Sequence, residues 1–101
     1  MGTVSRLDPR ELEQALRELE GWQVREGKLH RVYRFRDFVE AWGFMSAAAL
    51  LVQQMDHHPE WSNVYHTVTV NLVTHDAGGI SARDVELATK LEALAARWPK
   101  G

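Results

Sequence analysis

The sequence contains no cysteine. This absence excludes disulfides, a thiolate nucleophile and cysteine metal ligands, and it suits a reducing compartment. The sequence also has no run near the roughly 18 apolar residues of a membrane span, and its first residues lack the basic-then-apolar pattern of a secretory signal. We therefore expect a cytoplasmic protein that does not associate with membranes.

An excess of charge of either sign is also missing. The 12 Lys and Arg against 14 Asp and Glu give a formal net charge of -2, with no long basic run. There is accordingly no electrostatic case for binding a nucleic acid backbone. The 101 residues, 45% of them hydrophobic, fit one small globular domain over residues 1–101. A core of this size buries limited surface, so association into oligomers is expected.

Three helices are predicted by their capping signals. Asp8 before Pro9 begins the first, Asp37 begins a second that runs to about residue 55, and Ser81 with Asp84 begins a third. The second helix is apolar nearly all round, so we expect it to be buried on most sides, on the sheet and beneath neighbouring helices.

Four strands are predicted in two pairs. Residues 22–26 and 28–34 flank a Glu26-Gly27 turn, and residues 64–74 alternate apolar and polar after a brief strand at 63–65. Arginines interrupt the second strand, so we expect one wet face on this hairpin and a solvent-facing His30. The order α-β-β-α-β-β-α predicts an α+β fold, a four-stranded antiparallel sheet with three helices on one face.

Four of the five histidines lie between residues 56 and 84. His57 and His58 lie on the turn that leaves the second helix, because Pro59 cannot continue it, and His75 ends the following strand. Imidazoles exchange protons near neutral pH, so a proton-transfer site is one interpretation. A structural alternative stays open, in which the imidazoles cap the helix C-terminus and Asp84 is only a helix cap.

Other chemistries fit the sequence less well. Three imidazoles can hold zinc, but the usual His-x-His and His-x-x-x-His spacings are absent, so we expect no metal. Ser62 and Ser81 do not stand in a nucleophile-elbow context. Gly78 and Gly79 precede a helix, but the pair lacks the longer glycine pattern of a phosphate-binding loop.

Several blocks of the chain resemble the signature of the pterin-4a-carbinolamine dehydratases. They are Asp56-His57-His58-Pro59-Glu60-Trp61, Asn63-Val64-Tyr65, Thr74-His75-Asp76, Gly79-Ile80-Ser81 and Arg83-Asp84, and the likeness extends to residues 21–22 and 35–45. The resemblance implies an enzyme that dehydrates 4a-hydroxytetrahydropterin to quinonoid dihydropterin. This reaction recycles the tetrahydrobiopterin that aromatic amino acid hydroxylases use, and it requires no metal or bound cofactor.

The resemblance also implies roles for individual residues. His57 and His75 form the acid–base pair, His58 binds and orients the pterin, and Asp84 orients or charge-stabilises an imidazole. We further expect four residues to contribute to substrate binding, with the two tryptophans walling the pocket. These residues are Pro59, Trp61, Thr74 and Trp22.

One position departs from the family pattern. Many relatives carry an acidic residue four positions before the first histidine, where this chain has Gln53, so Asp56 or Glu60 would have to supply any carboxylate needed there.

Family members form dimers or tetramers, and the apolar stripe of the third helix, which includes Leu87 and Leu91, is a candidate contact. The alternative function is a non-catalytic interaction module of the same fold. The coactivator role of animal members has no support in this sequence.

Overall fold

The computed structural model describes residues 4–99, and it confirms the predicted order of elements. The helices are α1 (Pro9–Glu18), α2 (Phe38–Met55) and α3 (Ala82–Ala95), with a short 3-10 helix, η1 (His75–Ala77). The strands are β1 (Gln23–Arg25), β2 (Lys28–Arg34), β3 (Glu60–Val64) and β4 (Thr67–Leu72). All predicted helix starts are confirmed: Asp8, Asp37 and Ser81 each cap a helix with the side chain.

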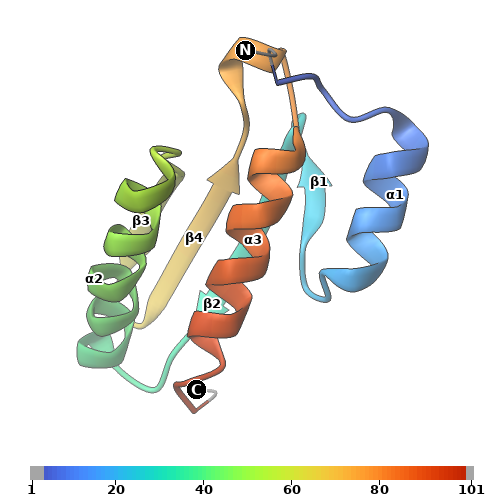
Figure 1. Cartoon of the computed structure of the whole chain (residues 1–101). Helices are drawn as coiled ribbons and strands as arrows, with labels where there is room; N and C mark the ends of the chain where they lie inside the picture. The colour runs from blue at the N-terminus through green and yellow to red at the C-terminus, as the bar shows by residue number, and fades with distance from the viewer. Residues whose placement is uncertain (1–3, 100–101) are drawn as a thin grey trace.

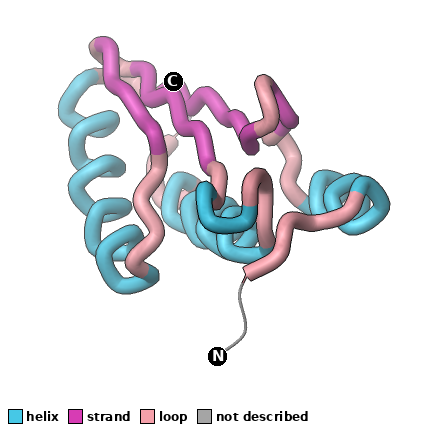
Figure 2. The backbone as a smooth tube through the Cα atoms, turned by 90° about the horizontal axis from the view of Figure 1, so that it is seen from above, coloured by secondary structure: helices cyan, strands magenta, loops and turns pink. Residues whose placement is uncertain are grey.

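The four strands form one antiparallel sheet in the order β1-β2-β4-β3. The turn between β1 and β2 is the predicted one, with positive φ at both Glu26 and Gly27, as a two-residue hairpin loop requires. Figures 1 and 2 show the three helices on the same side of the sheet. The opposite face of the sheet has no helix over it within residues 4–99.

The core lies between the sheet and the helices. Val68, Val70 and Leu72 alternate along β4 toward the helices and are at most 1% exposed. They meet Phe44 of α2 and Leu87 of α3, both fully buried. Burying each such side chain contributes about 1.5–3 kcal/mol. This core holds α2 and α3 together on one face of the sheet.

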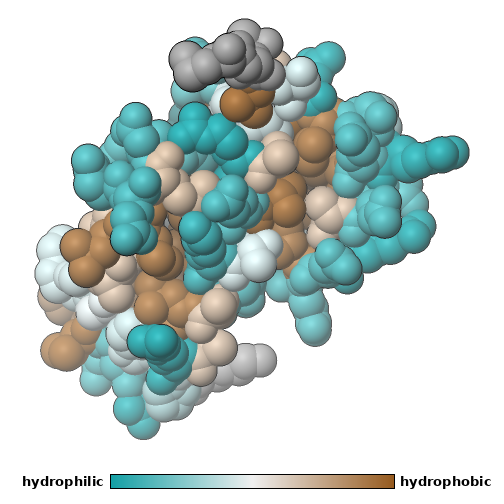
Figure 3. Space-filling view, viewed as in Figure 1, coloured by the Kyte–Doolittle hydropathy of each residue, from teal (hydrophilic) through white to brown (hydrophobic). Residues whose placement is uncertain are grey.

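The prediction that α2 is buried on most sides is wrong. An outward stripe of α2 is exposed, with Phe38 at 47%, Trp42 at 55% and Leu50 at 73%. The helix packs against α3 and β4, and among residues 4–99 no further helix covers its outer side. Figure 3 shows hydrophobic atoms at the surface over α2. The third helix behaves in the opposite way, since Leu87 and Leu91 of its stripe are fully buried against the core.

The prediction of a solvent-facing His30 is also wrong. His30 is only 8% exposed, and its Nδ1 lies 2.8 Å from Oδ1 of Asn71. The register explains this burial, because Gln23 of β1 and Asn71 of β4 are its direct neighbours on either side. A residue flanked on both sides within a sheet is covered by its neighbours even on the face without helices.

Chain segments with most of the predicted site residues meet at one end of the sheet, the upper end in Figure 1. There α2 ends, β3 begins, β4 ends and α3 begins. The loop from β4 to α3 is closed by backbone hydrogen bonds in both directions between Thr74 and Gly79. Gly78 has φ 74° within it, a conformation that a glycine adopts without strain. Among residues 4–99, no helix is both long and apolar enough to cross a membrane.

Candidate active site

The end of α2 directs His57 into the protein. Asp56 adopts a left-handed conformation with φ 50°, and the His57 N–H donates to the carbonyl of Val52 at 3.2 Å, as in a Schellman-type helix end. Arg83 of α3 donates through Nη2 to the carbonyls of Met55 at 2.8 Å and Asp56 at 3.0 Å. Backbone N–H groups and the Arg83 guanidinium therefore satisfy the last carbonyl groups of α2. The imidazoles of His57 and His58 do not take this role, which the capping alternative had assigned to them.

His57 forms a buried pair with Asp84. Its Nε2 lies 2.5 Å from Oδ1 of Asp84, and the two side chains are 8% and 0% exposed. Because a carboxylate oxygen accepts, the hydrogen belongs on Nε2. Nδ1 of His57 is then the ring atom left to accept a proton.

The second oxygen of Asp84 is held by a directed chain of hydrogen bonds. Oδ2 accepts from the Ser81 N–H at 2.9 Å and from the Thr74 hydroxyl at 2.8 Å. The Thr74 oxygen lies 2.6 Å from the Ser81 hydroxyl, whose oxygen accepts from the Arg83 N–H. Asp84 is thus at once the N3 residue of the capping box of α3 and the partner of an imidazole. The start of α3 also suits a negative charge, since the helix dipole is positive there.

His75 lies in different surroundings. It is the first residue of η1 and its side chain is 78% exposed. Its Nε2 lies 3.5 Å from Oε2 of Glu60, the first residue of β3. The other oxygen of Glu60 accepts a hydrogen bond from Lys28 of β2. The hydrogen bond from Lys28 lowers the pKa of Glu60, and the charges of Lys28 and His75 lower it further.

Four more of the predicted site residues lie near this end of the sheet: His58, Pro59, Trp61 and Thr74. His58 is exposed, and its Nε2 lies 3.2 Å from Oε1 of Gln53. Pro59 is half-buried, and Trp61 packs against the core from the helix side of β3, opposite Val70. Thr74 is 5% exposed, and its hydroxyl is engaged by Asp84 and Ser81.

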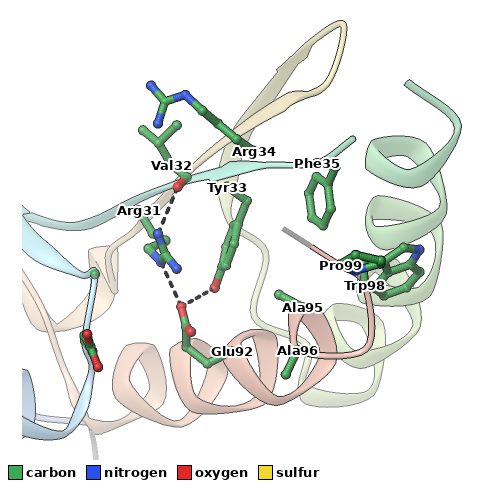
Figure 4. A pocket seen from close by; sticks show the side chains of 12 residues that line it. Arg31, Val32, Tyr33, Arg34, Phe35, Glu92, Ala95, Ala96, Trp98 and Pro99 are labelled. Carbon is green, nitrogen blue, oxygen red and sulfur yellow. Dashed lines mark hydrogen bonds and ion pairs between the residues drawn. The ribbon is translucent and has the colours of Figure 1, made fainter. Parts of the chain in front are cut away.

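Trp22 lies elsewhere. Its indole donates to Oε1 of Glu92 at 2.7 Å, and Glu92 is eight residues beyond Asp84, about 12 Å along α3. The same oxygen accepts from Arg31 at 2.9 Å and from the Tyr33 hydroxyl at 2.7 Å. Arg31, Tyr33 and Glu92 line a cavity of about 730 Å³, and Figure 4 shows Arg31 and Tyr33 directed at Glu92. The structure does not bring Trp22 together with the His57–Asp84 pair.

Sequence reasoning did not assign roles to Arg83 or Lys28. The signal for Arg83 was its position beside Asp84 in the first turn of α3. Lys28 had no signal in the sequence, because its contact with Glu60 joins residues 32 positions apart. Within residues 4–99, no three His, Cys, Asp or Glu side chains gather closely enough to hold a metal ion.

The fold and this end of the sheet define a class of protein: an α+β sandwich with a buried histidine–carboxylate pair beneath a helix N-terminus. The sequence profile described as "Pterin 4 alpha carbinolamine dehydratase" matches residues 5–94. A provisionally named pterin-4-alpha-carbinolamine dehydratase of Solibacter usitatus is 56% identical over 91% of this chain and 97% of its own length. The chain belongs to the pterin-4-alpha-carbinolamine dehydratase family.

Two solved structures resemble the fold. A crystal structure titled a transcriptional coactivator/pterin dehydratase from Brucella melitensis has a TM-score of 0.87 and 44% identity, covering 90% of this chain and 99% of that one. A pterin dehydratase-like protein, described as a RuBisCO assembly factor in the alpha-carboxysome, has a TM-score of 0.61 and 21% identity, covering 73% of this chain and 86% of that one. The second likeness concerns the fold alone.

Proposed function

We propose that this chain catalyses the dehydration of 4a-hydroxytetrahydropterin to quinonoid dihydropterin and water. The observation that carries the proposal is the buried His57–Asp84 pair, with Thr74 and Ser81 behind it, in a chain of this family. A carboxylate held by two other protein groups, the Thr74 hydroxyl and the Ser81 N–H, fixes one imidazole in one orientation and one tautomer, which is what proton transfer requires.

The reaction needs two proton transfers. The hydroxyl on the carbinolamine carbon leaves as water once an acid protonates it, and the neighbouring ring nitrogen gives its proton to a base. His57 exchanges a proton through Nδ1, because Asp84 occupies its Nε2. His75, on the loop that follows β4, makes the other transfer. Each transfer contributes about 10² to 10⁴ in rate, which suits a reaction that already proceeds slowly unaided.

The substrate-binding residues follow from the same proposal. His58 is exposed beside His57 and orients the pterin. Pro59 and Trp61 line its approach from the start of β3. Thr74 acts by holding Asp84, because its hydroxyl is already engaged there. The indole of Trp22 bonds Glu92 in another part of the molecule, so Trp22 is left out of the proposed pterin contacts.

The wider context is part of the proposal. The enzyme works in the cytoplasm, without metal or bound cofactor, and returns quinonoid dihydropterin to the pool that regenerates tetrahydrobiopterin for an aromatic amino acid hydroxylase. It forms a homodimer or homotetramer. The exposed stripe of α2, with Phe38, Trp42 and Leu50, is the contact surface that the burial pattern favours over α3.

Stopped-flow decay of chemically generated 4a-hydroxytetrahydropterin tests the reaction. Wild type should accelerate decay over buffer, and the His57→Ala, His75→Ala double variant should lose most of that acceleration. His66→Ala is the matched control, since His66 lies in the turn between β3 and β4, beside Tyr65. Equal rates for wild type, the double variant and buffer would contradict the proposal.

The second candidate function is a non-catalytic interaction module, which the exposed apolar stripe of α2 also fits. A measurement of partner binding by the same histidine variants separates the two functions. In an interaction module the histidine variants would leave its binding activity intact, while Trp42→Glu on α2 would abolish it.

A further inference from the structure

The face of the sheet without helices carries a polar cluster beside His75. Glu60 pairs with Asn71 across β3 and β4, so its side chain lies on the same face as that of Asn71. Asn71 lies opposite His30 of β2, and Lys28 shares the parity of His30. The Lys28–Glu60 ion pair therefore passes over the end of β4, on the side of the sheet away from α2 and α3.

Glu60 joins two groups that come from different elements. One oxygen takes the hydrogen bond of Lys28, and the other lies 3.5 Å from Nε2 of His75. A glutamate side chain that is 45% exposed is an anion at neutral pH, and the hydrogen bond from Lys28 lowers the pKa of Glu60 further. An anionic oxygen facing Nε2 favours the tautomer with hydrogen on Nε2 and leaves Nδ1 as the acceptor.

This arrangement parallels the buried pair. In both, a carboxylate oxygen faces Nε2 of an imidazole, and the second oxygen is held by another protein group. The two pairs differ in distance and in exposure. Oδ1 of Asp84 lies 2.5 Å from Nε2 of His57, and Oε2 of Glu60 lies 3.5 Å from Nε2 of His75. The side chain of Asp84 is 0% exposed and that of Glu60 is 45% exposed. An imidazole that is 78% exposed samples several rotamers unless a partner restrains it.

We infer that Glu60, held by Lys28, is a positioning residue for His75 in the dehydration. This inference rests on the proposed function and adds to it the residues that prepare the second imidazole. Glu60 restrains the ring of His75 and selects its tautomer, and Lys28 holds the carboxylate in place through its other oxygen.

The test combines a rate with a spectroscopic signature. Glu60→Gln keeps the shape of the side chain and removes its charge, and Lys28→Met removes the group that holds it. Glu86→Gln is the matched control, because Glu86 forms an exposed ion pair with Lys90 on α3, outside this cluster. Each variant is measured by stopped-flow dehydration and by ¹⁵N NMR of the His75 ring, whose two nitrogen shifts report the tautomer.

We expect Glu60→Gln to lower the rate about tenfold, less than the loss of His75 itself, because a general acid or base contributes about 10² to 10⁴. The His75 nitrogen shifts should move toward a mixture of tautomers in Glu60→Gln, and less so in Lys28→Met, while Glu86→Gln leaves both readouts unchanged. An unchanged rate in Glu60→Gln would overturn the inference, and so would a lowered rate with unchanged His75 shifts. If wild type itself fails to accelerate the reaction, the proposed function fails; if only Glu60→Gln is without effect, the inference alone fails.

Discussion

At the scale of single residues, Asp84 makes the contacts expected from two different interpretations of the sequence. The Ser-x-x-Asp spacing explains it as a helix cap, and the family resemblance makes it a partner for an imidazole. Both contacts exist, because Oδ2 caps α3 through the Ser81 N–H while Oδ1 faces His57. The capping pattern is local and could be predicted. The contact with His57 joins residues 27 positions apart, and only folding brings them together.

Asp84→Asn should reduce both the activity and the stability of the protein. If the amide oxygen keeps the bonds from Thr74 and Ser81, the amide NH₂ faces Nε2 of His57 and forces the opposite tautomer. We expect the dehydration rate to fall about 10²-fold or more, and the free energy of unfolding to fall by about 1–3 kcal/mol. Stopped-flow kinetics and urea unfolding measure the two effects.

The control for this change is Asp76→Asn, which removes the same charge from an exposed position two residues after Thr74. It should leave the rate and the unfolding free energy close to wild type. An Asp84→Asn protein with wild-type activity would show that the buried pair takes no part in the reaction.

Tyr33 should make the protein less stable as the pH becomes alkaline. Burial raises the pKa of Tyr33 well above its ordinary value, and the hydrogen bond to Glu92 and the charge of Glu92 raise it further. The folded protein therefore keeps the phenol proton after the unfolded chain has lost it. The stabilisation is complete below the unfolded pKa of about 10 and is lost as pH rises above that value, by up to about 1.4 kcal/mol per pH unit.

Urea unfolding from about pH 9 to about pH 11 measures this slope. Tyr33→Phe should be less stable at neutral pH by about 1 kcal/mol and should lose stability less steeply as pH rises. Tyr65→Phe is the control, since Tyr65 is 61% exposed, and its slope should equal that of wild type. Identical slopes for all three proteins would refute the assignment to Tyr33.

At the scale of elements, local signals were sufficient to predict where helices begin and where the first hairpin turns. Asp8, Asp37 and Ser81 act on backbone groups within three residues, and the Glu26-Gly27 turn needs only positive φ. The errors concern contacts between elements. The burial of His30 depends on strand register, and the exposure of α2 depends on which helices pack beside it. Neither is encoded in the periodicity of the segment concerned.

The connection between α2 and α3 depends on Arg83. Its guanidinium donates to the carbonyls of Met55 and Asp56, at the turn from which His57 enters the protein. Arg83→Ala should lower the free energy of unfolding by about 1–3 kcal/mol and lower the dehydration rate, because His57 loses part of its support.

Calorimetry and stopped-flow kinetics measure the effect of Arg83→Ala. Arg97→Ala is a suitable control, because Arg97 is an exposed residue that follows α3 at its opposite end. If Arg83→Ala and Arg97→Ala behave alike in both measurements, the guanidinium does not secure the end of α2.

At the scale of the whole molecule, the outward stripe of α2 is the main apolar feature that the fold leaves uncovered within residues 4–99. Phe38 and Trp42 stack on this stripe with ring centroids 6.0 Å apart, and the exposed Leu50 lies eight residues beyond Trp42 on the same helix. Apolar patches of this kind mark protein contacts, and a helix face shared between two copies gives a symmetric interface.

Sedimentation should show a dimer or tetramer of the 11.6 kDa chain. A Trp42→Glu, Leu50→Glu variant should shift it to smaller species, because buried carboxylates without partners are costly at an interface. Val24→Glu, at an exposed position of β1, should leave the assembly intact. A wild-type protein that sediments only as an 11.6 kDa species would contradict this prediction.

The sequence was sufficient to name the residues of the candidate site. It was not sufficient to predict which of them contact one another. The resemblance assigned His57, His75 and Asp84, and the fold carries all three to one end of the sheet. The tertiary contacts could not be predicted: Thr74 bonds Asp84, Lys28 bonds Glu60, and Trp22 bonds Glu92 on a distant turn of α3. Each joins elements whose relative placement depends on the packed core.

The most direct test is a crystal structure of the protein with a stable reduced pterin bound, such as a 7,8-dihydropterin. We predict that the bicyclic ring lies between the loops that carry His57 and His75, with both imidazoles within hydrogen-bond reach of the atoms that gain and lose protons. A pterin bound at the cavity beside Tyr33 and Glu92, or one that only one of the two imidazoles can reach, would contradict the claim that both histidines serve one substrate.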